Sequence, residues 1–194
     1  MFQVTLNRFK AKDEELLAEG QAGFRPDRST VEQTFNSQVI IEKHLQHQRY
    51  LFHKFLNFKK AFDRVRPVAG PRKLNTDEGL VRAIQTQYEN SSSAVLLNRQ
   101  LGEFFKTTVG VLQGCLLSSI LFNLFLEKIM QETMLTTTHL SLLVERSYAT
   151  HDCRRRHDID FMGGSNVELQ DLTNRLVDRA TAYGMQISTE RARS

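Results

Sequence analysis

The chain has 194 residues, 40% of them apolar and 25% charged, which is the composition of a folded domain rather than a disordered chain. Its formal net charge of +4 permits a polyanionic partner such as nucleic acid but does not require one. The two cysteines, Cys115 and Cys153, suggest no disulfide framework, and the charged N-terminus is not a secretory signal, so we expect an intracellular protein, nuclear or cytoplasmic.

The first third of the chain predicts helices followed by one strand. A short helix is expected at residues 12–19 and a compact loop at residues 21–28. A long helix is predicted to start at Ser29 or Thr30, because Ser29 with Glu32 and Thr30 with Gln33 both have the spacing of a capping box. The short aromatic-rich run at residues 51–58 predicts a buried strand, and a helical turn is expected at residues 59–65.

The rest of the chain predicts mixed helices and strands. Helices are expected at residues 77–88, at 117–130 and after the capping box that starts at Ser165, and strands at 93–97, 104–109 and 185–188. The helix at residues 117–130 is apolar on nearly all sides, so we expect it in the core. Polar residues interrupt that tract, which therefore does not predict a membrane span. The order of elements predicts a single α+β or α/β domain, residues 1–194, with helices packed on a small sheet.

Five short motifs follow one another along the chain. They are QAGFRPDRST at residues 21–30, FLNFKKAFD at 55–63, GVLQGCLLS at 110–118 continued by LFNLFLE at 121–127, DIDFMGG at 158–164, and YGMQISTE at 183–190. Each motif alone is a weak signal. Five in a fixed order across almost the whole chain make a strong one.

In this order the motifs resemble those of the reverse transcriptases of LINE-type, non-LTR retrotransposons. The resemblance implies a right-hand polymerase, with helices packed on a mainly antiparallel sheet. It implies fingers at about residues 1–49 and a palm, with finger-derived elements, at about residues 50–194. The chain would begin after the family's first finger motifs and end before the thumb. An RNA template, a DNA primer and two Mg²⁺ ions are the partners and cofactors that the resemblance implies, and it implies no membrane.

The resemblance also identifies the positions of the metal-binding carboxylates. The family has one aspartate at the end of its first palm strand and two in a Y/F-A-D-D hairpin. Here the three positions are Asn57, His157 and Asp158, so only Asp158 keeps a carboxylate that would bind metal. Asparagine lacks the charge, and histidine suits zinc or copper better than magnesium. We therefore expect the chain to be inactive as a polymerase.

Five further positions match family residues around the nucleotide. Phe62 matches the family's aromatic residue that excludes the ribose 2′-hydroxyl. Gln113 and Gly114 match the pair that packs on the incoming nucleotide and the template. Arg25 and Arg28 match finger residues near the phosphates. The resemblance therefore predicts a nucleotide-binding role for all five.

Lys54 is unusual for a buried palm strand. Alternation places it on the face opposite Asn57, where the strand is expected to pack on helices. A buried and unpaired ammonium group is costly, although lysine can extend its charged end to the surface.

Residues 142–156 have no coherent periodicity and are basic and polar. The codons TTT GCC GAC GAC encode Phe-Ala-Asp-Asp, and in another frame they contain TGC CGA CGA, which encodes Cys-Arg-Arg. That tripeptide stands at residues 153–155, just before Asp158. We therefore interpret the stretch as frameshifted, which the nucleotide sequence would test.

Three interpretations of the function are open on the sequence. The favoured one is a reverse-transcriptase domain without polymerase activity. The second is a nucleic-acid-binding remnant of such a domain, and the third is a translated pseudogene with no selected function. Affinity for an RNA–DNA hybrid that falls with salt would separate the second from the third.

Overall fold

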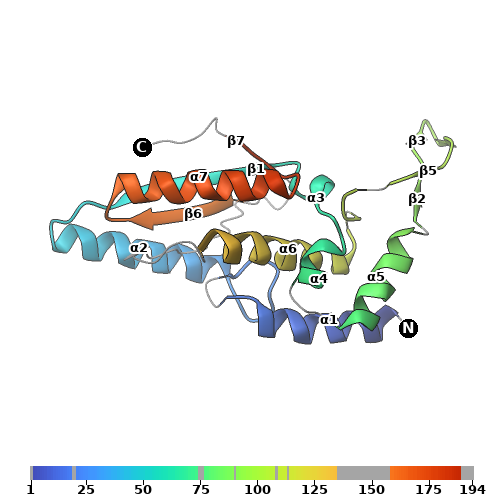
Figure 1. Ribbon diagram of the computed structural model, residues 1–194, viewed down its shortest axis with the longest axis horizontal. Coiled ribbons are helices and arrows are strands. Elements are labelled where there is room, and N and C mark those ends of the chain that lie inside the picture. The colour runs from blue at the N-terminus through green and yellow to red at the C-terminus, as the bar shows by residue number, and fades with distance from the viewer. Residues whose placement is uncertain are drawn as a thin grey trace. The chain divides into compact units, whose positions relative to one another are not determined.

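The computed structural model describes residues 2–18, 21–73, 77–89, 91–107, 109–112, 114–134 and 158–188 (Figure 1). The chain forms two compact units. The helical unit comprises Met1–Leu16 and Phe62–Phe125, and the sheet unit comprises Leu17–Ala61 and Leu126–Ser194. Helices occur together with small antiparallel sheets, which confirms the α+β class.

The sheet unit is built on a three-stranded antiparallel sheet in the order β6-β1-β7. Its strands are β1 (Phe52–Lys59), β6 (Asp158–Gly163) and β7 (Gln186–Ser188). β1 is the central strand, and it is only partly buried as predicted: its side chains Leu56 and Phe58 are buried, whereas Phe52 and Phe55 are exposed. Because side chains alternate along a strand, Asn57 lies on the opposite face from Leu56 and Phe58.

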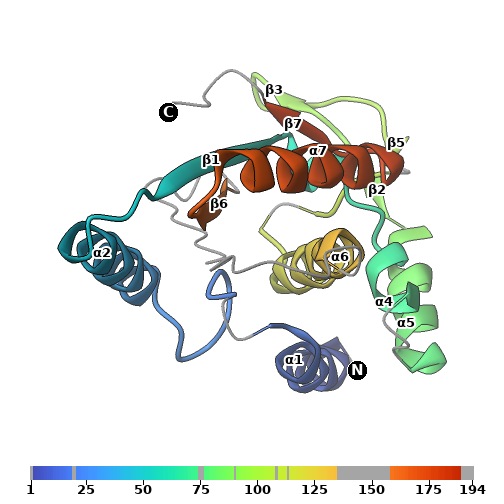
Figure 2. The ribbon, with the colours of Figure 1, turned by 60° about the vertical axis from the view of Figure 1, so that its left-hand side comes forward.

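Helix α7 (Asn166–Ala182) lies along one face of this sheet (Figures 1 and 2). Ser165 is its N-cap and accepts a hydrogen bond from the Glu168 N–H, as the capping-box spacing predicts. Gly184, at φ 81°, follows the helix in a backbone conformation that glycine adopts without steric cost. The buried apolar side chains of α7 recur every three or four positions, at Leu169, Leu172, Leu176 and Ala180.

Helix α2 (Thr30–Gln46) also belongs to the sheet unit, and Ser29 is its N-cap, as predicted. Several of its apolar side chains are exposed. The exposed fractions of Val31, Phe35 and Leu45 are 74%, 64% and 71%, whereas the polar Gln33 is buried. The capping signal therefore located the start of the helix, and the buried side of the helix includes a polar residue.

The helical unit contains several helices. They are α1 (Phe2–Leu16), α4 (Ala69–Lys73) and α5 (Glu78–Glu89), together with most of α3 (Ala61–Arg64) and the first part of α6 (Leu116–Met134). α1 and α4 both pack against α5. The prediction of a helix at residues 12–19 was too short, because α1 starts at Phe2 and buries Leu6 and Phe9 in its first half.

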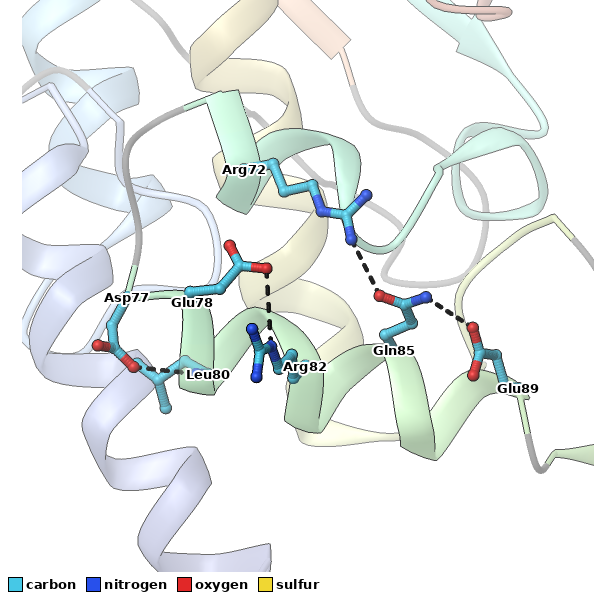
Figure 3. Close-up of polar contacts among 7 residues, drawn as sticks. All are labelled: Arg72, Asp77, Glu78, Leu80, Arg82, Gln85 and Glu89. Atoms are coloured by element: carbon cyan, nitrogen blue, oxygen red, sulfur yellow. Dashed lines mark hydrogen bonds and ion pairs between the residues drawn. The ribbon is translucent and has the colours of Figure 1, made fainter.

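Polar contacts join α4 to the exposed side of α5 (Figure 3). The Arg72 guanidinium donates to the Gln85 side-chain oxygen at 2.9 Å, and the Gln85 amide donates to Glu89 at 2.7 Å. The apolar side of α5 is buried through Val81 and Ile84. The predicted helix at residues 77–88 is thereby confirmed.

An antiparallel ribbon continues from the end of α5 and extends away from it (Figure 1). Two short ladders form it: β2 (Ser92–Ser93) pairs with β5 (Phe105–Lys106), and β3 (Leu96–Leu97) pairs with β4 (Gln100–Leu101). Asn98 and Arg99 form the turn, and both have positive φ angles, 48° and 64°. This is the backbone of a two-residue hairpin turn whose twist matches the flanking strands. The predicted pair of strands therefore exists, in shorter pieces than expected.

Helix α6 is apolar on nearly all sides and contributes residues to both units. Its buried side chains include Leu121 and Phe125 in the helical unit and Ile129 and Met130 in the sheet unit. The prediction of a core helix at residues 117–130 is confirmed. Among the residues that the structure describes, no helix is long and apolar enough to cross a membrane.

Candidate active site

The pairing of β1 with β6 brings two of the three predicted metal-binding positions together. Asn57 and Asp158 are directly opposite each other in the antiparallel ladder, and Ser188 of β7 is opposite Asn57 on its other side. Opposite residues in such a ladder share one face of the sheet, with Cβ atoms about 4.5–5.5 Å apart. The third position, His157, lies outside the described residues. The register thus brings Asn57 and Asp158 to the same level of the sheet, and the Asn57 side chain is on the face that is turned away from α7.

A buried carboxylate of β6, that of Asp160, lies on the same face of the sheet as Asn57. Asp160 is opposite Phe55 in the register, is only 3% exposed, and contacts the Nε2 atom of His53. Burial raises the pKa of Asp160 above its ordinary value, and the hydrogen bond to His53 acts in the opposite direction. Asp160 is therefore engaged within the sheet and does not replace the carboxylate that Asn57 lacks.

The described donors on this face do not fit a centre of two magnesium ions. Magnesium requires hard oxygen ligands, mainly carboxylates. Asn57 offers a neutral amide oxygen, and Asp160 is buried against an imidazole. Within the described part of the chain, no group of three His, Cys, Asp or Glu side chains could hold a metal ion.

In the helical unit, the second and third motifs are joined by their backbones. The Gly110 N–H donates to the Val65 carbonyl and the Val111 N–H donates to the Phe62 carbonyl, both at 2.9 Å. Gly110 has φ 100°, and a Cβ atom there would lie 3.1 Å from the backbone of Asp63. Glycine adopts this conformation without strain and leaves room for the close approach. The backbone geometry therefore explains why the first residue of the GVLQG motif is glycine in this chain.

The predicted nucleotide-binding residue Phe62 lies beside this junction. Its ring stacks on the ring of Phe122 in α6, with centroids 5.2 Å apart. Gly114 has φ 83° and an open surrounding, since no atom lies within 4 Å of a Cβ built there. Gln113, between the two glycines of this motif, lies outside the described residues. The structure therefore brings Phe62 next to the loop that carries the predicted pair.

A tyrosine that the sequence did not single out closes the same loop. The Ser118 hydroxyl donates to the Leu112 carbonyl at 2.6 Å and lies 3.5 Å from the Tyr88 hydroxyl. Burial raises the pKa of Tyr88, while the hydrogen bond with Ser118 lowers it. These contacts hold the turn in front of α6. No sequence signal connected Tyr88 to this motif.

The two predicted phosphate-binding arginines differ in their surroundings. Arg25 is 9% exposed, and its guanidinium donates to the carbonyls of Ala18 and Gln21 at 2.8 and 3.0 Å. Arg28 is exposed, one residue before the N-cap of α2. Arg25 thus stabilises the loop that contains it, and Arg28 is the arginine of this motif with an exposed side chain.

Lys54 lies on the α7 face of the sheet, as alternation predicts. Its ammonium group donates to the Gln170 side-chain oxygen of α7 at 2.5 Å, at an exposed position. It thereby avoids an unpaired buried charge. A hollow of about 400 Å³ adjoins it, lined mainly by residues of β1, α7 and β7, with Leu56 and Val177 among them. This hollow includes neither Asn57 nor Asp158.

A comparison with protein families agrees with the motifs and with the fold. The sequence profile of the family described as reverse transcriptase (RNA-dependent DNA polymerase) matches residues 1–192. That match includes all five motifs and the strands β1 and β6 that carry Asn57 and Asp158. The chain therefore belongs to the reverse transcriptase family.

Proposed function

We propose that this chain is a LINE-type, non-LTR reverse-transcriptase domain in which DNA synthesis has been lost while the polymerase fold is kept. The observation that carries the proposal is the register of β1 and β6, which puts Asn57 opposite Asp158. A metal-binding face with one amide in place of a carboxylate, and with His157 at the third position, supplies too little negative charge for two divalent ions.

The size of the expected defect follows from the role of the metals. In phosphoryl transfer, two divalent ions stabilise the attacking and the leaving oxygens, and each contributes several kcal/mol to the transition state. Every ~1.4 kcal/mol corresponds to about tenfold in rate. Loss of two of three carboxylates therefore lowers synthesis by on the order of 10³-fold or more.

The same proposal assigns roles to the other residues that match family motifs. Asp158 is the one carboxylate kept at a metal position, and the aromatic ring of Phe62 would face the sugar of the nucleotide. Gln113 and Gly114 would contact the nucleotide and the template, and Arg28 the phosphates. The polymers that the domain would accept are an RNA template and a DNA primer.

Primer extension tests the proposal. Extension of an oligo(dT) primer on poly(rA) with Mg²⁺ is measured for three proteins. They are the unmodified chain, the Asn57→Asp, His157→Asp double variant, and the Asn174→Asp variant. The last variant adds one negative charge on α7, away from the predicted metal positions, where the Asn174 side chain accepts a hydrogen bond from Gln170; the double variant adds two. We expect no extension by the unmodified chain or by Asn174→Asp, and measurable extension by the double variant. Robust synthesis by the unmodified chain would contradict the proposal.

A second candidate function is nucleic-acid binding without catalysis, and exposed cations near the end of β1 favour it. Lys59 and Lys60 are both exposed, and the chain has a net charge of +4. Fluorescence anisotropy with an RNA–DNA hybrid tests it, because contacts to phosphates make the logarithm of the binding constant fall linearly with the logarithm of salt concentration. Reversing both charges, Lys59→Glu with Lys60→Glu, reduces that slope if these residues bind phosphate. An unchanged slope would remove them from the interface.

A further inference from the structure

The hollow of the sheet unit, between α7 and the strands β1 and β7, has the properties of a small-molecule site. Its volume is about 400 Å³, which is within the range of ligand sites in proteins, and most of its wall is apolar. The apolar part of the wall includes Leu56 of β1, Val177 of α7 and Ile187 of β7. The polymerase proposal uses none of these residues, so the hollow has no role yet.

The short length of β7 explains why there is a hollow beneath α7. β7 pairs only with residues 57–59 of β1. Among the described residues, no strand therefore lies beside the first part of β1 on this side. α7 contacts both β1 and β7, so it extends past the end of the third strand. The space that a longer third strand would fill is left open.

One end of the hollow presents hydrogen-bond donors. The Lys54 ammonium donates to the Gln170 side-chain oxygen at 2.5 Å, and the Gln170 amide donates to the Asn174 side-chain oxygen at 2.8 Å. Both amide oxygens thus accept within the chain, which leaves ammonium N–H groups and the Asn174 amide N–H groups for a ligand. Among the described residues, Lys54 forms no ion pair. This end therefore favours an anion.

The opposite end carries a negative charge. Asp178, which also lines the hollow, is eight residues after Gln170 on α7, or about 12 Å along the helix axis. The sheet gives a similar length, because Ile187 is opposite Phe58, four residues or about 13 Å along β1 from Lys54. The hollow therefore has a positive end and a negative end, with an apolar wall between them.

We propose that this hollow binds an amphipathic monocarboxylate, a small molecule with one carboxylate at the end of a slender apolar chain. Its carboxylate accepts hydrogen bonds from the Lys54 ammonium and the Asn174 amide, and the contact with Lys54 is charge-assisted. The apolar chain lies against Leu56 and Val177, and its burial supplies most of the affinity. The site is separate from Asn57 and Asp158, so it stands whether or not the polymerase proposal holds.

The two charged ends give the hollow a selectivity for one acid group over two. A second carboxylate at the far end of the same chain would lie near the like charge of Asp178 and beside apolar side chains. We therefore expect octanedioate to bind at least fivefold more weakly than octanoate. For octanoate, which has about ten non-hydrogen atoms, we expect a dissociation constant on the order of 1 mM.

Heteronuclear NMR of the isotopically labelled full chain, titrated with sodium octanoate to about 10 mM, tests the proposal. We expect the backbone amide signals of Lys54, Val177 and Ile187 to shift and to saturate. The same titration with sodium octanedioate measures the selectivity. Neither titration depends on polymerase activity.

Variants separate the hollow from general apolar adhesion. Val177→Phe fills the hollow, and we expect it to abolish measurable binding. The matched control is Val167→Phe, which makes the same change on α7 at a position that is 79% exposed, and binding is expected to stay unchanged. Lys54→Met removes the ammonium group and is expected to weaken binding about fivefold. Its control, Lys43→Met on α2, changes another exposed lysine and is expected to have no effect.

Three results would overturn the proposal. One is the absence of saturable shifts at the residues of the hollow. Another is a loss of binding in Val167→Phe as large as that in Val177→Phe. The third is octanedioate that binds as tightly as octanoate. The dispersion of the amide signals shows whether each variant is folded, and the comparison of the two acids on the unmodified chain decides the question even where Val177→Phe does not fold.

Discussion

The Asp160 carboxylate is buried in the sheet and contacts the His53 imidazole, so its proton equilibrium is linked to folding. Burial raises its pKa above the ordinary value of 3.8, more than the hydrogen bond to His53 lowers it. The folded chain therefore holds this proton more tightly than the unfolded chain does. Its contribution to stability is largest below pH 3.8 and falls as pH rises from 3.8 through the raised pKa.

Substitution of Asp160 by asparagine tests this linkage. Asp160→Asn removes the titrating group and keeps its size, so the free energy of unfolding of the variant is expected to rise relative to that of the unmodified chain as pH increases. Urea unfolding of both proteins, at steps from about pH 4 to about pH 7, gives the difference between their stabilities. A difference that stays constant with pH would show that Asp160 does not titrate in this way.

The glycines around residue 113 provide a second prediction for single residues. Gly110→Ala strains a positive φ and brings a Cβ atom within 3.1 Å of the Asp63 backbone. We expect a loss of unfolding free energy of about 2–3 kcal/mol. Gly114→Ala is the matched control, because its φ is also positive but its surroundings are open, and we expect a loss of about 1 kcal/mol. Equal losses, measured by denaturant unfolding, would argue against the close approach.

Residue chemistry was only partly predictable from the sequence. The motifs alone identified Asn57 and Asp158 as metal-binding positions of the family. The strand register places these two positions opposite each other. The contact between His53 and Asp160 could not be predicted, because it depends on a pairing between strands far apart in the chain. Arg25 matches a motif position, yet its guanidinium bonds to two loop carbonyls, and no motif encodes that burial.

At the scale of elements, α7 and α2 show why some helices were predictable in full and others only in position. Both have a serine N-cap at the predicted place. The apolar stripe of α7 packs on the sheet, so its period coincides with burial. On α2, Val31, Phe35 and Leu45 are exposed while Gln33 is buried. Capping is a local interaction that sequence encodes directly, whereas the buried face depends on the partner.

Alanine substitutions in the two helices test that difference. Leu176→Ala removes a fully buried side chain of α7, and we expect it to lower the free energy of unfolding by about 2–5 kcal/mol. Leu45→Ala removes one that is 71% exposed on α2, and a change within about 0.5 kcal/mol is expected. Chemical denaturation followed by circular dichroism compares the two variants. A loss at Leu45 as large as that at Leu176 would mean that α2 buries the opposite face.

At the scale of the whole molecule, the chain combines a helical unit and a sheet unit, each with a buried core. The family match covers both units, so the chain belongs to the reverse transcriptase family over nearly its whole length. The five motifs occur in order within this match, on either side of the proposed change at Asn57.

Thermal unfolding tests whether this fold is stable in isolation. A chain with buried cores in both units is expected to lose its far-UV helical signal cooperatively on heating. Circular dichroism at increasing temperature measures this directly. A signal that declines gradually, without a transition, would instead support the interpretation of a decayed sequence without a stable fold.

The central proposal is that the sheet in which Asn57 lies opposite Asp158 does not hold two divalent ions. Members of this family use divalent metal ions on nucleic-acid templates. Electron paramagnetic resonance of Mn²⁺, titrated into the unmodified chain and into the Asn57→Asp, His157→Asp variant, counts bound ions without requiring synthesis. We predict no tightly bound Mn²⁺ in the unmodified chain and a gain of bound ions in the variant. Two tightly bound ions in the unmodified chain would contradict the account.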